Sequence, residues 1–189
     1  LEEMGELDNT IIVMTSDHGM PFPRGKANLY DSGTRVPLAI RWPGHVPAGR
    51  RVTDFVSTTD LAPTFLESAG LRTPVDMGGQ SLLSLLVSGR SGRLERVRDH
   101  VIFGRERHTQ AQEAPNSGGY PARGIRTDRY LYIRNFHPNR WPAGTPNHEK
   151  AFVKNAWLAD CDNGPTKWYL WSHRDDPTVK QYYKLAFGM

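Results

Sequence analysis

An adjacent aspartate and histidine, Asp17 and His18, follow a short apolar run and precede a glycine. If the backbone turns at Gly19, the carboxylate and the imidazole can both face one cation. Lys26 follows closely enough to bring a positive charge to an anion held by that cation. The three side chains indicate metal-assisted binding of an anionic group. Taken alone, however, the Asp-His pair equally fits a surface turn capped by Asp17, and Lys26 fits a solvated loop lysine.

Two apolar segments enclose this stretch and must position it. Residues 10–14, Thr-Ile-Ile-Val-Met, show no polar alternation, which is typical of a strand buried on both faces of an α/β sheet. Residues 36–40 form a second apolar run that ends at Trp-Pro-Gly, and they predict another strand. The candidate residues therefore leave the first strand at its C-terminal end, where ligands collect in open α/β sheets.

The remaining chain predicts two short helices and a second sheet. Thr59-Asp60 could cap a helix over residues 61–69 that stops at Gly70, and another helix is predicted for residues 81–87. Segments 100–103, 122–126 and 130–136 suggest a small antiparallel sheet. For the last fifty or so residues, the pattern predicts only loops and a helix near residues 178–185.

Composition restricts the class of protein. The chain has 189 residues, 38% of them hydrophobic, and a formal charge of +4, which is typical of globular proteins. No apolar run has the roughly 18–20 residues of a membrane span. Nucleic acid is not an expected partner, because the basic residues are scattered and form no recognition motif. The single cysteine, Cys161, excludes an intrachain disulfide framework and a cysteine-based zinc cluster, and gives no information on the compartment.

The segment from Thr15 to Pro37 resembles the second conserved signature of the sulfatase family, within the alkaline phosphatase superfamily. A strand is followed by Thr-Ser-Asp-His-Gly, by a basic residue, and by glycine and proline before the next strand. The resemblance continues to residues 124–130, Gly-Ile-Arg-Thr-Asp-Arg-Tyr. The run Asp-His-Gly-Met-Pro-Phe-Pro-Arg-Gly-Lys is most similar to heparan N-sulfatase (sulfamidase)-like members.

The resemblance implies an α/β fold, in which residues 1–95 are the C-terminal part of the sulfatase catalytic domain. Residues 96–189 would form a small, truncated α+β subdomain with an antiparallel sheet. Asp17 and His18 would be ligands of a divalent metal, and Ca²⁺ is the ion that the family implies first. Mn²⁺ is the alternative, because the imidazole of His18 is a softer ligand than the asparagine that is more usual at this position. Lys26 would be a catalytic residue that contacts the sulfate; sulfamidase-like members can carry arginine there.

The resemblance also implies a nucleophile that this chain does not contain. Sulfatases use a formylglycine made from a Cys/Ser-x-Pro-x-Arg motif, and the sequence has no such motif. Cys161 has proline at the wrong spacing and no following arginine, so it is interpreted as an ordinary thiol. We therefore expect an upstream N-terminal part of the same protein to complete the site, and this chain alone to be inactive. The family favours a periplasmic or secreted location.

His108 and Arg123 are candidate substrate contacts, and Arg105 and Glu106 are considered with them, although polar side chains in such a loop are more often solvated. The aromatic residues between Trp157 and Tyr183 could stack on a carbohydrate, but they are expected to close a small core. The predicted function is hydrolysis of sulfate esters or sulfamates, with a sulfated small molecule or glycan as substrate. The alternatives are a phosphodiesterase or phosphonate monoester hydrolase of the same superfamily, and a non-catalytic binding module.

Overall fold

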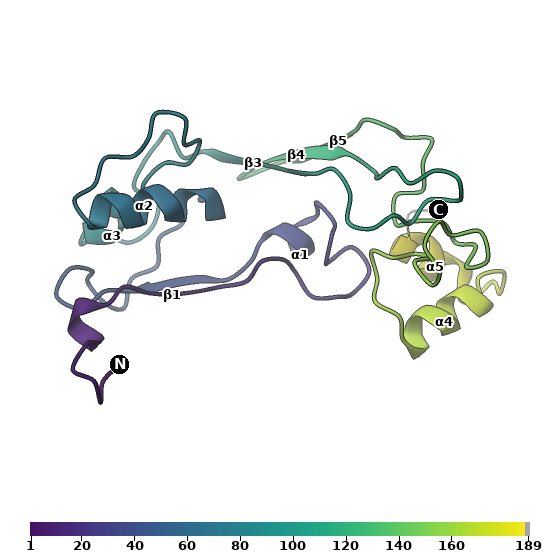
Figure 1. Cartoon of the computed structure of the whole chain (residues 1–189), viewed down its shortest axis with the longest axis horizontal. Helices are drawn as coiled ribbons and strands as arrows, with labels where there is room; N and C mark the ends of the chain where they lie inside the picture. Colours follow the sequence, from purple (N-terminus) through teal and green to yellow (C-terminus); the bar gives the residue numbers. More distant parts are fainter. Residues whose placement is uncertain (188–189) are drawn as a thin grey trace. The chain divides into compact units, whose positions relative to one another are not determined.

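The computed structural model describes residues 1–187 (Figure 1). In chain order, the elements are η1 (Leu7–Asn9), β1 (Ile12–Thr15), α1 (Asp31–Thr34), β2 (Leu38–Arg41), η2 (Thr58–Asp60), α2 (Leu61–Ser68), α3 (Leu83–Val87), β3 (His100–Arg105), β4 (Ala122–Thr127), β5 (Leu131–Asn135), α4 (Pro165–Ser172) and α5 (Lys180–Phe187). Within residues 1–187, no helix combines the length and the apolarity that a membrane crossing requires.

The chain divides into two compact units, and it passes between them several times. Unit 1 contains Leu1–Thr15, Leu38–Val101 and Arg126–Tyr130. Unit 2 contains Ser16–Pro37, Ile102–Ile125 and the chain from Leu131 onward. The predicted boundary near residue 95 concerns the domains of the complete protein, and it stays a prediction.

Strands β1 and β2 pair antiparallel, with Ile12 opposite Arg41 and Thr15 opposite Leu38. Both strands were predicted, but the expected burial of the first strand on both faces is wrong for the described residues. Met14 is 56% exposed, and Thr15 is exposed as well. The sheet has only two strands in the described chain, and while Ile12 and Val13 are half-buried, Met14 and Thr15 at the end of β1 are not covered.

Unit 1 also contains helices α2 and α3. Helix α2 matches the predicted helix and stops before Gly70, whose positive φ of 72° suits glycine. The predicted cap is corrected: Ser57 and Asp60 form a capping box at η2, which runs directly into α2. Asp60 is buried and also accepts hydrogen bonds from Arg98 at 2.9 Å and from the backbone N–H of Gln80 at 2.9 Å. This carboxylate therefore ties the start of α2 to two later segments.

Strands β3, β4 and β5 form the second sheet that was predicted, and they lie in that order. β4 and β5 are joined by a tight turn in which the backbone N–H of Thr127 donates to the carbonyl of Tyr130 at 2.9 Å. The observed strands agree with the predicted segments to within a few residues at each end.

The core of unit 2 lies around helices α4 and α5. Its buried residues are Ala143, Trp157, Leu158, Cys161, Tyr183 and Phe187. Trp157, Trp168 and Trp171 contact one another with ring centroids 4.7–5.6 Å apart. The predicted aromatic core is thus present, although Trp168 and Tyr169 remain about half exposed. Helix α4 was not predicted, yet Pro165 directly after Gly164 is a recognisable helix start.

Candidate functional site

The loop from Ser16 to Pro37, in unit 2, carries Asp17, His18 and Lys26. Its two ends are held together because the backbone N–H of Gly19 donates to the carbonyl of Gly33 at 3.0 Å. A Cβ atom at Gly19 would lie 1.9 Å from the Ser32 carbonyl oxygen, and one at Gly33 would lie 2.3 Å from the Asn28 carbonyl oxygen. Only glycine fits at both positions, which explains why the motif places glycines there.

Asp17 and His18 lie side by side directly after β1. The His18 Nε2 atom is 3.5 Å from the Asp17 Oδ2 atom. The other ring nitrogen, Nδ1, lies 2.7 Å from the Gly19 carbonyl oxygen, so it is placed to donate its proton there. In that tautomer, Nε2 keeps a free lone pair next to the carboxylate, which is the arrangement that two ligands of one cation need.

These two residues fit a divalent cation as part of a ligand set. The Asp17 side chain is 85% exposed, so its oxygens are accessible. Between residues 1 and 187 there is no group of three or more His, Cys, Asp or Glu side chains that could hold a metal. Because calcium takes about six to eight oxygen ligands, further ligands would have to come from elsewhere.

Lys26 is fixed at both its backbone and its side chain. Its N–H donates to the Met20 carbonyl at 2.8 Å, and its carbonyl accepts from the Asn28 side chain at 3.2 Å. Its Nζ atom donates to Asp162 Oδ1 at 3.0 Å. The ammonium group predicted to contact sulfate is therefore paired with a carboxylate, an interaction that the sequence did not indicate.

His108 and Arg123 each face an acidic side chain. His108 Nδ1 lies 3.4 Å from Asp160 Oδ1, and the His108 side chain is 27% exposed. Arg123 pairs with Glu106 and lies against Gly104 of β3. The predicted substrate contacts are accessible in part, and no described contact brings either of them to Lys26.

Arg105 organises the surroundings of this loop. It pairs with the buried Asp160 and donates to the carbonyl of Ala27 and, at 2.7 Å, to that of Pro142. Since Ala27 directly follows Lys26, these bonds connect the loop to the segment around Asp160. Arg105 was considered as a possible substrate contact from its position in the Gly-Arg-Glu-Arg-His run, but its bonds to the loop and to Asp160 were not predicted.

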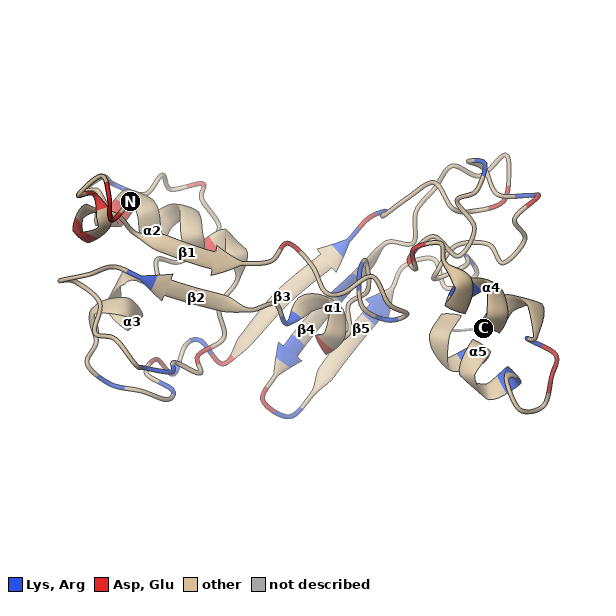
Figure 2. Cartoon of the chain, turned by 90° about the horizontal axis from the view of Figure 1, so that it is seen from below, with Lys and Arg blue, Asp and Glu red and all other residues tan. Residues whose placement is uncertain are grey.

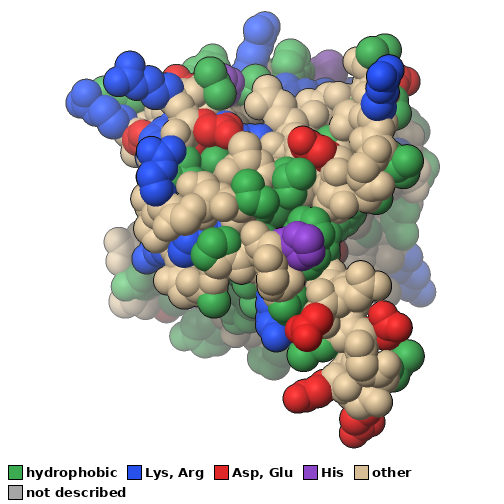
Figure 3. Space-filling model, turned by 90° about the vertical axis from the view of Figure 1, so that its left-hand side faces the viewer, with side chains coloured by type: hydrophobic (Ala, Val, Ile, Leu, Met, Phe, Trp, Pro, Cys, Tyr) green, Lys and Arg blue, Asp and Glu red, His purple; other side chains and the backbone are tan. Residues whose placement is uncertain are grey.

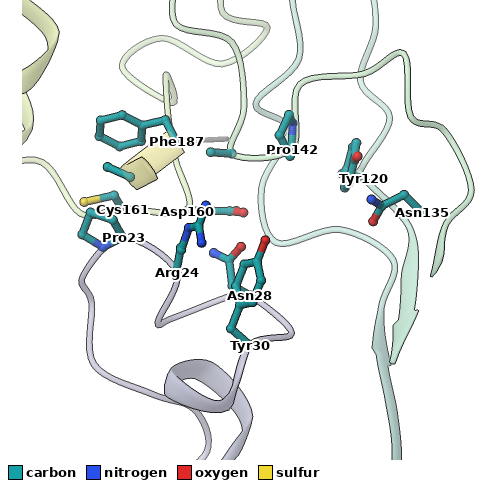
Figure 4. A pocket seen from close by; sticks show the side chains of 12 residues that line it. Pro23, Arg24, Asn28, Tyr30, Tyr120, Asn135, Pro142, Asp160, Cys161 and Phe187 are labelled. Carbon is teal, nitrogen blue, oxygen red and sulfur yellow. The ribbon is translucent and has the colours of Figure 1, made fainter. Parts of the chain in front are cut away.

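A cavity of about 190 Å³ lies beside the loop (Figure 4). Its lining residues are Pro23, Arg24, Asn28, Tyr30, Tyr120, Asn135, Pro142, Ala143, Asp160, Cys161, Ala186 and Phe187. None of the predicted site residues is among them. The cavity residues Arg24, Asn28 and Tyr30 were not predicted as site residues. Because they belong to the same motif as Lys26, their position in that motif could have indicated them.

Burial changes the acidity of two groups at the cavity. It raises the pKa of the Tyr120 phenol, against the opposing effect of the Arg105 cation. It also raises the pKa of the Cys161 thiol. Both groups are therefore protonated at neutral pH, so Tyr120 can donate a hydrogen bond and Cys161 has the character of an inert thiol.

Charged side chains elsewhere are mixed. Lys and Arg are spread along the described chain and interspersed with Asp and Glu (Figure 2). In the space-filling view, hydrophobic side chains reach the surface between charged ones (Figure 3). Exposed apolar residues of unit 1 include Met4, Leu71 and Val75.

Comparison with a solved structure defines the class of protein. The chain superimposes over 98% of its length, with a TM-score of 0.60 and 25% sequence identity, on 36% of a protein solved "in complex with its substrate D-Glucosamine-2-N, 6-O-disulfate". Sequence comparison finds an ulvan-active sulfatase of Formosa agariphila, 38% identical over 69% of this chain and 24% of that protein. The fold is the alkaline-phosphatase-like fold of sulfatases, as predicted.

Residues 20–143 match the family model described as N-sulphoglucosamine sulphohydrolase, C-terminal. The chain belongs to this family, which confirms the predicted resemblance to sulfatases of the sulfamidase type. The human N-sulphoglucosamine sulphohydrolase is 29% identical over 72% of this chain. The chain spans about a quarter of the length of these relatives, 24% of the Formosa protein and 27% of the human one.

Proposed function

We propose that the complete protein is a sulfatase that hydrolyses sulfate esters or sulfamates of a sulfated sugar. The observation that carries this proposal is the family match over residues 20–143. It is supported by the names of the relatives, an ulvan-active sulfatase and an N-sulphoglucosamine sulphohydrolase, and by the sugar disulfate bound to the structural neighbour. The choice between an ester and a sulfamate is left to the experiment below.

In this proposal, Asp17 and His18 hold a divalent cation, with calcium first and manganese as the alternative. The cation would supply positive charge to the sulfate group when bound. The Asp17 carboxylate and the His18 Nε2 atom support this role because they face each other at 3.5 Å and the Nδ1 proton is directed to a carbonyl. The remaining ligands would lie outside this chain.

Lys26 contacts the sulfate and stabilises the negative charge that moves to the leaving oxygen. Its backbone is held by Met20 and Asn28, so a change of partner from Asp162 to sulfate requires only side-chain movement. His108 and Arg123 are proposed as further substrate contacts. The nucleophile is a formylglycine that lies upstream of this chain, and the residues described here position the sulfate for it.

The test is release of inorganic sulfate by the purified complete protein. The substrates are N-sulfoglucosamine, glucosamine 6-O-sulfate and an aryl sulfate, with a phosphodiester and a phosphonate monoester as comparisons. We expect the protein to hydrolyse a sulfated sugar. This activity should stop when a chelator removes the divalent cation, and it should return when calcium is added. Cleavage of only the phosphorus esters would favour the phosphodiesterase alternative, and binding of the sugars without any hydrolysis would favour a binding module.

A further inference from the structure

The cavity next to the Lys26 loop has a polar end and an apolar end. Arg24, Asn28 and Tyr30 extend from the loop into the same space, on the side of Asp160 (Figure 4). Pro23 and Phe187 belong to the apolar end. A volume of about 190 Å³ is roughly six times the ~30 Å³ share of one water molecule, so the cavity has room for a ring-sized ligand.

Arg24 brings an unneutralised positive charge to this cavity. Its guanidinium lies 5.0 Å from the centre of the Tyr30 ring. Within residues 1–187, no acceptor or carboxylate is paired with that guanidinium, although it carries five donors. The one carboxylate that lines the cavity, Asp160, is already engaged by Arg105 and His108. Arg24 is exposed, so water hydrates its guanidinium, and an anionic ligand in the cavity would replace that water.

The backbone holds Arg24 in an unusual conformation. Its φ is 62°, and Ala27 has a φ of 64°. Left-handed conformations cost a non-glycine residue on the order of 1 kcal/mol, and such residues cluster at ligand-binding sites. The carbonyl of Arg24 is held by the Ser32 hydroxyl at 2.5 Å, which fixes the residue in this orientation.

The other polar groups suit neutral oxygen atoms. The Tyr120 phenol is protonated at neutral pH, as a phenol ordinarily is, and burial raises its pKa further, so it can donate. Tyr30 and Asn135 add a second hydroxyl and an amide to the lining. A combination of aromatic surface, neutral hydrogen-bonding groups and one cation is complementary to a sugar ring with an acidic substituent, because such a ring has an apolar C–H face, hydroxyls and one negative charge.

We infer that this cavity binds one sugar ring that carries a sulfate or carboxylate group, with Arg24 on the acidic group and the tyrosine hydroxyls on the ring oxygens. The ring would be part of the substrate of the reaction proposed above, and to that extent the inference rests on the proposed function. Binding itself can be measured without turnover.

The experiment is calorimetric titration of the complete protein in the Lys26→Ala background, which removes the proposed sulfate contact. The ligands are D-glucosamine 2-N,6-O-disulfate, D-glucuronate, D-glucosamine and inorganic sulfate. We expect one or both acidic sugars to bind at least about tenfold more tightly than D-glucosamine and inorganic sulfate. Introducing Arg24→Met into the Lys26→Ala protein should weaken binding of the acidic sugar by about 10–100-fold. Introducing Tyr30→Phe instead should weaken it by about 3–10-fold.

The exposed pair Arg129 and Tyr130 provides matched controls, since Arg129 lies 5.4 Å from the Tyr130 ring in the β4–β5 turn, outside the cavity. Arg129→Met and Tyr130→Phe should leave binding unchanged. Thermal unfolding checks that every variant is folded, and Tyr30→Phe, which removes one oxygen, keeps the test valid if Arg24→Met unfolds.

The outcomes separate this inference from the proposed function. Two results would overturn the cavity assignment, even if the wild type hydrolyses sulfated sugars. One is that the folded Arg24→Met protein binds both acidic sugars as tightly as its parent does. The other is that inorganic sulfate binds as tightly as the sugars. Arg24-dependent binding by a wild type that hydrolyses no sulfate would support the cavity and contradict the proposed function.

Discussion

The Nζ atom of Lys26 lies 3.0 Å from Oδ1 of Asp162, a residue 136 positions later in the chain. The Lys26 side chain is 24% exposed and the Asp162 side chain 54% exposed, so water screens the pair and the interaction is weak. The proposed sulfate contact therefore has an internal competitor that can be displaced. This relationship connects the sulfatase motif with the C-terminal segment, and it can be tested directly.

Asp162→Asn should strengthen inhibition of the complete enzyme by inorganic sulfate. The substitution releases the Lys26 ammonium and removes one negative charge from its surroundings. Exposed ion pairs contribute about 0.2–1 kcal/mol, which corresponds to an inhibition constant lower by about 1.5–5-fold. Asp128→Asn is the matched control, because Asp128 is also exposed and pairs with Arg93 in unit 1. Weaker inhibition by sulfate in Asp162→Asn would mean that Asp162 supports the sulfate contact.

Asp17→Ala and Lys26→Ala should reduce the activity of the complete enzyme in different ways. Asp17→Ala removes a metal ligand, so its low kcat should rise when the cation concentration is increased. Lys26→Ala should lose about 10²–10³-fold in kcat/KM without rescue by added cation, and Lys26→Arg should keep part of the activity. A metal titration of all three variants distinguishes the roles. Rescue of Lys26→Ala by cation, together with no rescue of Asp17→Ala, would reverse the assignment.

The chain of residues 1–189 alone should not hydrolyse an aryl sulfate. It can supply the proposed Lys26 contact and two of the proposed metal ligands, but it has no Cys/Ser-x-Pro-x-Arg motif from which the formylglycine could be made. Loss of the nucleophile removes the covalent step itself. The measurement is sulfate release by the purified chain with calcium, alongside the complete protein. Turnover that copurifies with the chain through successive columns would show that another nucleophile exists.

Local sequence signals predicted the elements that depend on neighbouring residues. The apolar run before Asp17, the stop at Gly70 and the turn between β4 and β5 each follow from contacts within a few residues. Motif residues likewise predicted the sulfatase family, which the match over residues 20–143 confirms.

Interactions between distant loops could not be predicted in the same way. Lys26 and Asp162 are 136 residues apart, and Arg105 and Asp160 are 55 residues apart. Both acidic partners lie in a segment without helical or strand periodicity, so no local pattern indicates where they fold. Helix α4 was missed for a related reason: its aromatic residues lie on several sides, so the segment lacks a clear apolar face.

Truncation of Asp60 should destabilise unit 1 far more than truncation of an exposed carboxylate. Asp60 and Arg98 are both buried and lie 2.9 Å apart, and Asp60 also accepts from Ser57 and Gln80. Asp60→Ala would leave the buried Arg98 guanidinium with Glu95 as its remaining carboxylate partner, and it would also remove the acceptor of the Ser57 and Gln80 N–H groups. Removal of one partner of a buried ion pair costs up to about 3–5 kcal/mol. Asp128→Ala should cost less than about 1 kcal/mol. Denaturant unfolding of the two variants gives the comparison, and equal losses would contradict this role of the buried pair.

Lys167 should make the stability of unit 2 depend on pH. Its side chain is only 2% exposed, and its ammonium donates to the carbonyls of Trp157 and Cys161, at 2.6 and 3.0 Å, and to the Asn163 side chain at 2.9 Å. Burial lowers the pKa of Lys167 from 10.5 to about 8, while the nearby Cys161, Asp162 and Asp160 oppose this shift. The folded state therefore binds the lysine proton less tightly than the unfolded state does.

The sign of the expected effect follows from this difference in proton binding. Between pH 7 and pH 9 the folded protein releases the Lys167 proton and the unfolded chain keeps it, so the free energy of unfolding should rise by on the order of 1 kcal/mol. The series stops at pH 9 because Cys161, whose pKa is raised from 9.0 by burial, contributes stability that is lost above that value. Lys167→Met should abolish the rise, whereas Lys180→Met, at an exposed lysine of α5, should retain it. Urea unfolding of the three proteins across this range is the measurement, and parallel curves for the wild type and Lys167→Met would show that the lysine does not release its proton in the folded state.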